Sequence, residues 1–574
     1  MARFFEEHKN RLIQSLNGTW DFMTDPENIG EIQGWAKCLP HSCKVTVPSM
    51  WNNEMGLLEY EGAAWYQKKF YTRGGTLRFC FEGVMTIADV WLDGVHLGSH
   101  YGGFCQFDFI VRDVVKGEHI LTVRADNRFD EHSIPQTNVD WYHYGGISRD
   151  VSVEILDGIC VLYNRMEYDL DAGMTEAECR FVVELYNGAQ DELTSALQIA
   201  LGEETLFSRD ITLGAGEHRE LVTPAIKVKN IQLWNLQNPF LYPVHIWTDQ
   251  DDLIDRVGFR KITVEEHCIK LNGKAIELRG INRHEEHPDW GFAFPQKLMK
   301  RDIDIIKDLG CNTIRGSHYP NSKKFVDMLD ESGLLFWSEI PIWGAGFSTE
   351  ALGDPVVVER GLAMHREMVK YYYNHPSIFI WGMHNEIRSG NQNAYVMTEK
   401  YYRYLKENGG NRLVTYAAGY PLTDICLEFC DVICINDYWG WYGGNIEKWD
   451  DYVDQIRERR KCLNLEEKPV VFSEFGAAAL YGNHTFDDIR WTEEYQAKLI
   501  SYCLNLFHED PMVAGFYIWH FADARTCRDT GLNRARGFNN KGLLNEYRKP
   551  KAAYFAVRDL YHKFEEEELR KELL

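Results

Sequence analysis

The length, composition and charge of this chain exclude several classes of protein. Its 574 residues are too many for one hydrophobic core, and the length predicts roughly three or four domains. The composition, 45% hydrophobic and 26% charged, is typical of a soluble globular protein, and the net charge of −24 argues against binding to nucleic acid, which requires a cationic surface.

No targeting or membrane segment is expected. Residues 1–9 contain no apolar run long enough for a signal peptide, and no stretch approaches the ~20 apolar residues of a membrane span. Cys426, Cys430 and Cys434 recur every four residues, as metal ligands sometimes do. Because no histidine or paired thiol accompanies them at a tighter spacing, we favour buried thiols in a reducing cytoplasm.

Two β-rich stretches come first along the chain. Residues 1–160 are predicted to be all-β, because strand-like runs such as 76–81 and 88–92 alternate with turns such as 93–94 and 102–103. Residues 161–262 show similar alternation, for example at 180–185, and have the size of one immunoglobulin-like sandwich. We therefore expect two β-sandwich domains.

From residue 263 the pattern changes to helices that alternate with buried strands. Met299, Ile303 and Ile306 share one helical face, and a second helix is expected over 321–331. The expected strands are 276–279, 313–315, 334–337, 378–386, 413–416, 431–435, 470–474 and 513–519. Eight strands are the number that closes a (β/α)8 TIM barrel, which we predict for residues 263–574.

Two glutamates stand at the ends of predicted barrel strands. Glu386 ends the fourth strand and Glu474 ends the seventh. Barrel enzymes build their active sites at the carboxyl ends of the strands, and glycoside hydrolysis requires two facing carboxylates. Either glutamate alone would more often be an ordinary strand-end residue. Together, on a predicted barrel, they indicate a glycosidase site.

The neighbours of the two glutamates predict different roles for them. Asn385 precedes Glu386, and its amide can donate to the sugar hydroxyl beside the anomeric carbon, which favours Glu386 as the acid/base. Glu474 must stay ionised to act as the nucleophile, and Tyr438 at the end of the sixth strand is placed to donate to it. A carboxyl separation of ~5–5.5 Å would mean retention of configuration and ~6.5–9.5 Å inversion, and the sequence leaves this open.

Longer motifs resemble a known family. Residues 16–20 and 91–94 look like parts of its N-terminal sugar-binding sandwich, and residues 312–320 and 374–386 are similar to its two barrel signatures. On these motifs the chain resembles glycoside hydrolase family 2, and within it the β-glucuronidases, over nearly its whole length. The resemblance implies a jelly-roll-like sandwich at 1–160 and a retaining mechanism with Glu386 as acid/base and Glu474 as nucleophile.

The resemblance also implies a substrate and further site residues. Segment 537–542 looks like the Asn-x-Lys motif of β-glucuronidases, in which Asn539 and Lys541 would hold the carboxylate of a glucuronide. An acidic protein needs such a local cation to accept an anionic sugar. Other implied pocket residues are Asp140, His284, His318 and Trp519. The mechanism needs no metal or cofactor, and the family implies a homo-oligomer, either a dimer or a tetramer.

Alternative functions stay open. A β-galacturonidase on the same scaffold would need the same cation and would differ only in binding an axial hydroxyl. A β-galactosidase is less expected, since family members of that kind usually continue with further domains after the barrel. A non-catalytic carbohydrate-binding protein is disfavoured by the presence of both Glu386 and Glu474.

The chain departs from the family pattern in several places. Asp437 stands where an arginine usually precedes the tyrosine that ends the sixth strand. The loop after the eighth strand is longer than usual and rich in arginine, and Arg534 or Arg536 is the candidate to replace the arginine expected there. Segment 344–355 is short, which predicts an open mouth, for larger glycans or with weak selection of the aglycone. The charged tail 564–571 is expected to be a solvated helical end.

Overall fold

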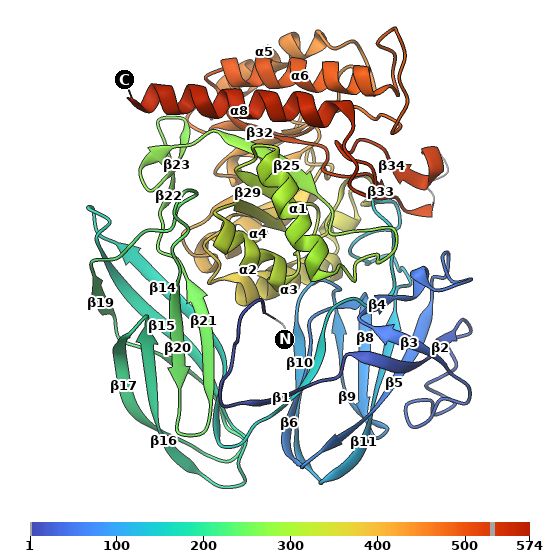
Figure 1. The fold of residues 1–574 in the computed structure, drawn as a ribbon, viewed down its shortest axis with the longest axis vertical. Coiled ribbons are helices and arrows are strands. Elements are labelled where there is room, and N and C mark those ends of the chain that lie inside the picture. The colour runs from blue at the N-terminus through green and yellow to red at the C-terminus, as the bar shows by residue number, and fades with distance from the viewer. Residues whose placement is uncertain (1–2, 529–533, 574) are drawn as a thin grey trace.

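The computed structural model describes residues 3–528 and 534–573 and contains two β-sandwiches and a closed barrel (Figure 1). The sandwiches, blue and green in Figure 1, lie side by side below the barrel. The predicted fold class, β-sandwiches followed by a TIM barrel, is confirmed. We keep 1–160, 161–262 and 263–574 as our proposed domain limits.

The first sandwich consists of a four-stranded and a six-stranded sheet, in the orders β1-β13-β6-β10 and β3-β2-β5-β11-β8-β9. Alternate residues of each strand face inward, so Trp20, Phe79 and Val123 share one apolar core. A small sheet, β4-β12-β7, adjoins them. The strands are β1 (Leu12–Ser15), β2 (Gly18–Asp25), β3 (Cys43–Val47), β4 (Ser49–Met50), β5 (Ala63–Thr72), β6 (Gly75–Phe81), β7 (Val84–Met85), β8 (Ile87–Leu92), β9 (Val95–Tyr101), β10 (Phe107–Val114), β11 (Gly117–Asp126), β12 (Gly146–Ile147) and β13 (Val151–Ile155).

The second sandwich faces the sheet β14-β15-β18, with β19 also paired to β15, against the sheet β17-β16-β20-β21. Its core includes Phe181, Ile199 and Val244. The strands are β14 (Ile159–Leu170), β15 (Glu176–Asn187), β16 (Leu193–Leu201), β17 (Glu204–Leu213), β18 (His218–Val222), β19 (Ile226–Lys229), β20 (Tyr242–Trp247) and β21 (Asp252–Val257). A short three-stranded sheet leads into the barrel, formed by β22 (Ile262–Glu265), β23 (Cys268–Leu271) and β24 (Lys274–Ala275).

The barrel closes through eight parallel strands in sequence order. Nearly every strand residue is buried, because side chains inside the barrel and helices outside it cover both faces. The strands are β25 (Leu278–Arg283), β26 (Thr313–Gly316), β27 (Leu335–Glu339), β28 (Ile378–Asn385), β29 (Leu413–Ala418), β30 (Ile433–Asn436), β31 (Val470–Phe475) and β32 (Val513–Ile518). A two-stranded sheet, β33 (Ala524–Arg525) with β34 (Phe538–Asn539), follows the last strand.

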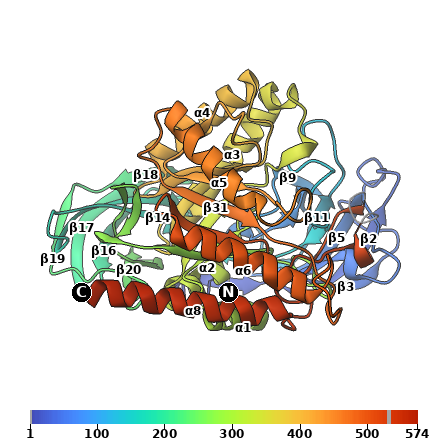
Figure 2. The same cartoon turned by 90° about the horizontal axis from the view of Figure 1, so that it is seen from above.

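Helices pack around the barrel, as Figure 2 shows from above. They are α1 (Gln296–Asp308), α2 (Lys323–Ser332), α3 (Pro355–Tyr372), α4 (Gln392–Asn408), α5 (Lys448–Cys462), α6 (Glu493–Glu509) and α8 (Ala552–Leu573). In the described part of the chain, none of the helices is both long and apolar enough to cross a membrane.

The C-terminal tail is less solvated than the sequence predicts. Helix α8 runs alongside α6 (Figures 1 and 2), and Phe564 is buried in the barrel core. Arg279 donates to Glu568 at 2.7 Å, and His508 lies 3.1 Å from Glu567. The run of charges hid this docking, because a single apolar residue such as Phe564 gives little helical periodicity.

Candidate active site

Glu386 and Glu474 lie at the carboxyl ends of β28 and β31 and line one cavity of about 350 Å³. Glu474 is the penultimate residue of β31, while Glu386 directly follows β28 with a φ of 51°. That left-handed conformation is sparsely populated for residues with side chains and recurs at functional sites. Of the residues predicted from sequence, Asp140, Tyr438 and Trp519 line the same cavity.

Glu474 accepts hydrogen bonds at both carboxylate oxygens. Arg315 Nη1 donates to Oε1 at 2.8 Å, and the Tyr438 hydroxyl donates to Oε2 at 2.7 Å. Burial raises the pKa of Glu474 to about 7, against the opposing effects of Arg315 and Tyr438. These donors favour the ionised carboxylate that a nucleophile requires.

The surroundings of Glu386 stabilise its ionised carboxylate less than those of Glu474 do. Asn436 Nδ2 donates to its Oε1 at 2.8 Å. Burial, and after it the negative charge of Glu474, raise the pKa of Glu386 to about 8. Because Glu474 accepts from Arg315 and Tyr438 while Glu386 accepts from Asn436 and is acted on by the charge of Glu474, Glu386 is the carboxyl group favoured to keep its proton, as a general acid must.

Removal of the Tyr438 hydroxyl tests this order of ionisation. In Tyr438→Phe, Glu474 loses a hydrogen bond that lowers its pKa, so the pKa should rise. The acidic limb of the kcat/KM profile, where Glu474 becomes protonated, should move to higher pH, while the alkaline limb set by Glu386 should move much less. Profiles of the two enzymes on one aryl glycoside measure this. An acidic limb that stays in place would contradict the assignment.

Asn385 is placed to donate to a ligand. Its Oδ1 accepts from Arg315 Nη2 at 2.7 Å and from Asn436 Nδ2 at 3.0 Å, and this fixes the orientation of the amide. Its Nδ2 is buried and has no hydrogen-bond partner within the described residues. A buried donor without a partner is costly, and a sugar hydroxyl would satisfy it.

Trp519 lines the cavity, and the predicted pocket residues His318 and His284 do not line it but are buried against Trp519. The His318 ring stacks on Trp519 at 5.1 Å between centroids, and its Nδ1 lies 2.7 Å from Glu339 Oε1. Burial lowers the pKa of His318 well below its usual value and that of His284 to about 3. Both imidazoles are therefore neutral near neutral pH and add no positive charge beside the glutamates.

The predicted residues Asp140, Asn539 and Lys541 gather at one place in the site. Asp140 comes from the loop between β11 and β12, and its carboxylate accepts from Asn539 Nδ2 at 2.6 Å and pairs with Arg534 at 2.5 Å. Lys541 Nζ donates to the Tyr442 hydroxyl at 2.6 Å. Asn539 and Lys541 do not line the cavity themselves but lie directly behind Asp140 and Tyr442, which do.

Several residues at the site escaped the sequence analysis. Arg315 is fully buried and joins Glu474, Glu339 and Asn385. An arginine within an apolar barrel strand is the signal that would have found it. Asn436, Trp343, Tyr420 and Tyr442 also line the cavity, and no pattern in their own segments marks them. Asp437, which the sequence marks as a departure from the family pattern, lines the cavity as well, and its Oδ1 accepts from the backbone N–H of Tyr438 at 2.7 Å.

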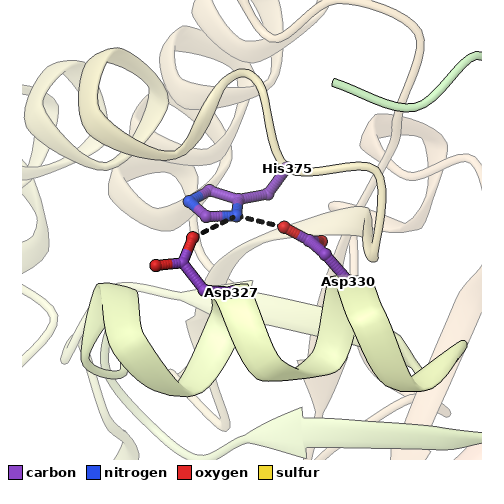
Figure 3. A group of neighbouring side chains, drawn as sticks. All are labelled: Asp327, Asp330 and His375. Atoms are coloured by element: carbon purple, nitrogen blue, oxygen red, sulfur yellow. Dashed lines mark hydrogen bonds and ion pairs between the residues drawn. The ribbon is translucent and has the colours of Figure 1, made fainter. Parts of the chain in front are cut away.

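Three side chains outside this cavity are spaced as metal ligands could be, but they have a structural role. Asp327 and Asp330 on α2 face His375 (Figure 3). Arg3 Nη2 donates to Asp327 at 2.8 Å, the backbone N–H of Phe4 donates to it at 3.0 Å, and His375 lies 2.5 Å from Asp330. Because Arg3 already occupies the Asp327 carboxylate and His375 lies against Asp330, we assign this group to anchoring the N-terminal segment on the barrel.

The three cysteines that were predicted to be buried are buried. Cys426, Cys430 and Cys434 are buried and free. Burial raises the pKa of each, which leaves the thiols protonated and poor metal ligands.

Comparison with known proteins adds independent findings. Residues 262–566 match the family model described as glycosyl hydrolases family 2, TIM barrel domain, and residues 13–156 match the sugar binding domain of the same family. A β-glucuronidase from Paenibacillus borealis is 27% identical, with 96% of this chain and 97% of that protein covered.

Two solved structures are similar over nearly the whole chain. A β-galacturonidase from Eisenbergiella tayi bound to galacturonate is 33% identical with a TM-score of 0.90, and covers 98% of this chain and 99% of its own. A β-glucuronidase from Ruminococcus gnavus in complex with D-glucaro-d-lactam is 27% identical with a TM-score of 0.86, and covers the same shares.

Proposed function

The chain belongs to glycoside hydrolase family 2, and on this premise we propose that it is a retaining β-glucuronidase that releases glucuronate from β-D-glucuronides. The observation that carries the proposal is one cavity with two strand-end glutamates and a lysine behind its wall. The glutamates supply acid and nucleophile, and the lysine supplies the cation that an anionic sugar requires.

In the first step Glu474 attacks the anomeric carbon while Glu386 gives its proton to the glycosidic oxygen. The bond to the aglycone breaks, its electrons leave with the protonated aglycone, and an ester forms between glucuronate and Glu474. The Asn385 amide donates to the neighbouring sugar hydroxyl, a bond that strengthens as positive charge develops on the ring.

In the second step water hydrolyses the ester. Esterification removes the negative charge of Glu474, which is one cause of the raised pKa of Glu386. The pKa of Glu386 therefore falls, and its carboxylate can take a proton from the attacking water. Water adds to the same face that the aglycone left, so the configuration is retained, and Glu474 leaves as a carboxylate.

Lys541 is proposed to bind the substrate carboxylate together with Asn539. Its Nζ is buried against the Tyr438 and Tyr442 rings, at 5.1 and 4.6 Å from their centroids. The Tyr442 hydroxyl accepts from Nζ, and the Tyr442 side chain is 65% exposed to solvent. Its hydroxyl occupies the position that a carboxylate oxygen would take.

Replacement of Lys541 tests the substrate class. In Lys541→Ala the loss of a charge-assisted hydrogen bond of ~1.5–3 kcal/mol should lower the preference for glucuronide over glucoside roughly tenfold to a hundredfold. Nitrophenyl glycosides that differ only at C6 and C4 measure the ratio of kcat/KM values. Lys69→Ala in β5, an exposed lysine far from the barrel mouth, is the matched control. An unchanged ratio in Lys541→Ala would rule out the proposed carboxylate grip.

A β-galacturonidase is the second candidate, favoured by the 33% identity to the Eisenbergiella tayi protein. Both candidates need the cation and differ in the orientation of the C4 hydroxyl. The same panel separates them, because a glucuronide and a galacturonide differ only in the configuration at C4. A neutral galactoside as best substrate would point instead to a β-galactosidase and leave Lys541 without its proposed role.

We also propose that the protein works as a homo-oligomer in the cytoplasm. The family resemblance supports the first part, and the exposed thiols of Cys38, Cys43 and Cys462 support a reducing compartment. Sedimentation velocity on the purified protein would measure the assembly state.

A further inference from the structure

We infer that Trp343 and Tyr420 form the subsite for the leaving group and that it takes an aglycone with a flat apolar face, either an aryl ring or a pyranose. This inference rests on the proposed function, because it needs Glu386 as the residue that protonates the glycosidic oxygen. Both aromatic residues line the cavity that contains Glu386 and Glu474.

Two glycine–aromatic pairs flank Glu386. A Cβ on Gly419 would lie 3.1 Å from Glu386 Cγ, and Tyr420 follows that glycine. A Cβ on Gly344 would lie 3.6 Å from the Glu386 carbonyl oxygen, and Trp343 precedes that glycine. The glycines bring the two loops against the acid, and the aromatic residues beside them line the same cavity as its carboxyl group. The subsite for an aglycone that Glu386 protonates is therefore placed at these two rings.

The loop that carries Tyr420 is fixed relative to Glu386. Ser389, three residues after Glu386, donates to the buried Asp424 at 2.6 Å, and the backbone N–H of Ile425 donates to the Ser389 carbonyl at 3.2 Å. Asp424 also accepts from the Tyr416 hydroxyl at 3.1 Å. These bonds tie the loop to the segment of the acid, so the subsite is formed before substrate binds, as precise binding requires.

The cavity lining combines charged and aromatic side chains. Asp140 and Arg534 pair at 2.5 Å, and the aromatic residues Trp343 and Tyr420 belong to the two loops that pack against Glu386. Tyr420 is 54% exposed, so its ring is accessible to a ligand. Trp343 is partly buried and held edge-on against Trp141, at 6.3 Å between centroids.

Aromatic rings of this kind select by shape. They pack well on the face of an aryl ring or on the C–H face of a pyranose, and they gain little from a methyl group. An aglycone that contacts Trp343 and Tyr420 would therefore be selected by stacking.

Tyr420 variants test the subsite on three uronides with the same sugar and different aglycones: phenyl, glucosyl and methyl. In Tyr420→Ala, kcat/KM for the phenyl or glucosyl substrate should fall about tenfold more than for the methyl substrate, since one aromatic contact contributes ~0.5–1.5 kcal/mol beyond its buried area. Tyr420→Phe should behave like the unmodified protein because the ring is kept. Tyr71→Ala, which removes a similarly exposed tyrosine (58% exposed) from β5, is the matched control.

The outcomes separate this inference from the proposed function. A selective loss on the phenyl substrate alone, or on the glucosyl substrate alone, supports the subsite and identifies its ligand. An equal loss on all three substrates, or no loss on either flat one, overturns it. If the unmodified protein hydrolyses no uronide at all, the proposed function has failed before the variants are compared.

Discussion

Glu474→Gln should abolish turnover while leaving the fold intact. The amide cannot form the ester to the anomeric carbon, so kcat should fall by about four orders of magnitude or more. The fold should survive, because Arg315 keeps its pair with Glu339 at 2.8 Å when the Glu474 charge is lost. Hydrolysis of a nitrophenyl glucuronide measures activity, and thermal unfolding measures integrity.

Glu407→Gln is the matched control for this variant. Glu407 lies on the exposed face of α4, and the same chemical change there should leave kcat unaltered. Substantial activity in Glu474→Gln would refute the nucleophile assignment. An unfolded Glu474→Gln protein would instead contradict the account of how Arg315 is held.

Glu386→Ala should impair substrates according to their leaving groups. Without a general acid, a poor leaving group such as an alkyl alcohol must depart as an anion, and kcat/KM should fall about 10²–10⁴-fold. A nitrophenolate leaves readily unprotonated, so the first step on nitrophenyl glucuronide should suffer much less. A series of aryl and alkyl glucuronides of graded leaving-group pKa measures the slope.

The same variant also tests the second step. Without a general base the ester to Glu474 should hydrolyse slowly, so nitrophenyl substrates should give a rapid burst of product followed by a slow steady state. An equal loss for all leaving groups, with no burst, would argue against the acid/base role of Glu386.

Much of the barrel could be predicted from sequence because its strands are short apolar runs, buried on both faces, that end abruptly. The strand ends also placed Glu386, Glu474 and Tyr438 at one mouth, since parallel strands present their carboxyl ends to the same side. The structure places the Tyr438 hydroxyl 2.7 Å from Glu474, as their neighbouring strand ends suggested.

What the sequence could not provide are contacts between distant segments. Asn539 meets Asp140 across 399 residues, and Arg3 reaches Asp327 across 324. Neither has a periodic signal, because each depends on how whole domains dock. The C-terminal helix differs, because Tyr554, Val557, Tyr561 and Phe564 form a buried apolar face at helical spacing, and only its charged end depends on the distant residues Arg279 and His508.

The most direct test of the central claim is to trap the covalent intermediate. A 2-deoxy-2-fluoro glucuronyl fluoride slows both steps but still has a good leaving group, so the ester should accumulate. Intact-mass and peptide mass spectrometry should then find one uronyl adduct per chain, on Glu474. An adduct on another residue, or no adduct together with a hydrolysis product of inverted configuration in NMR, would contradict the account.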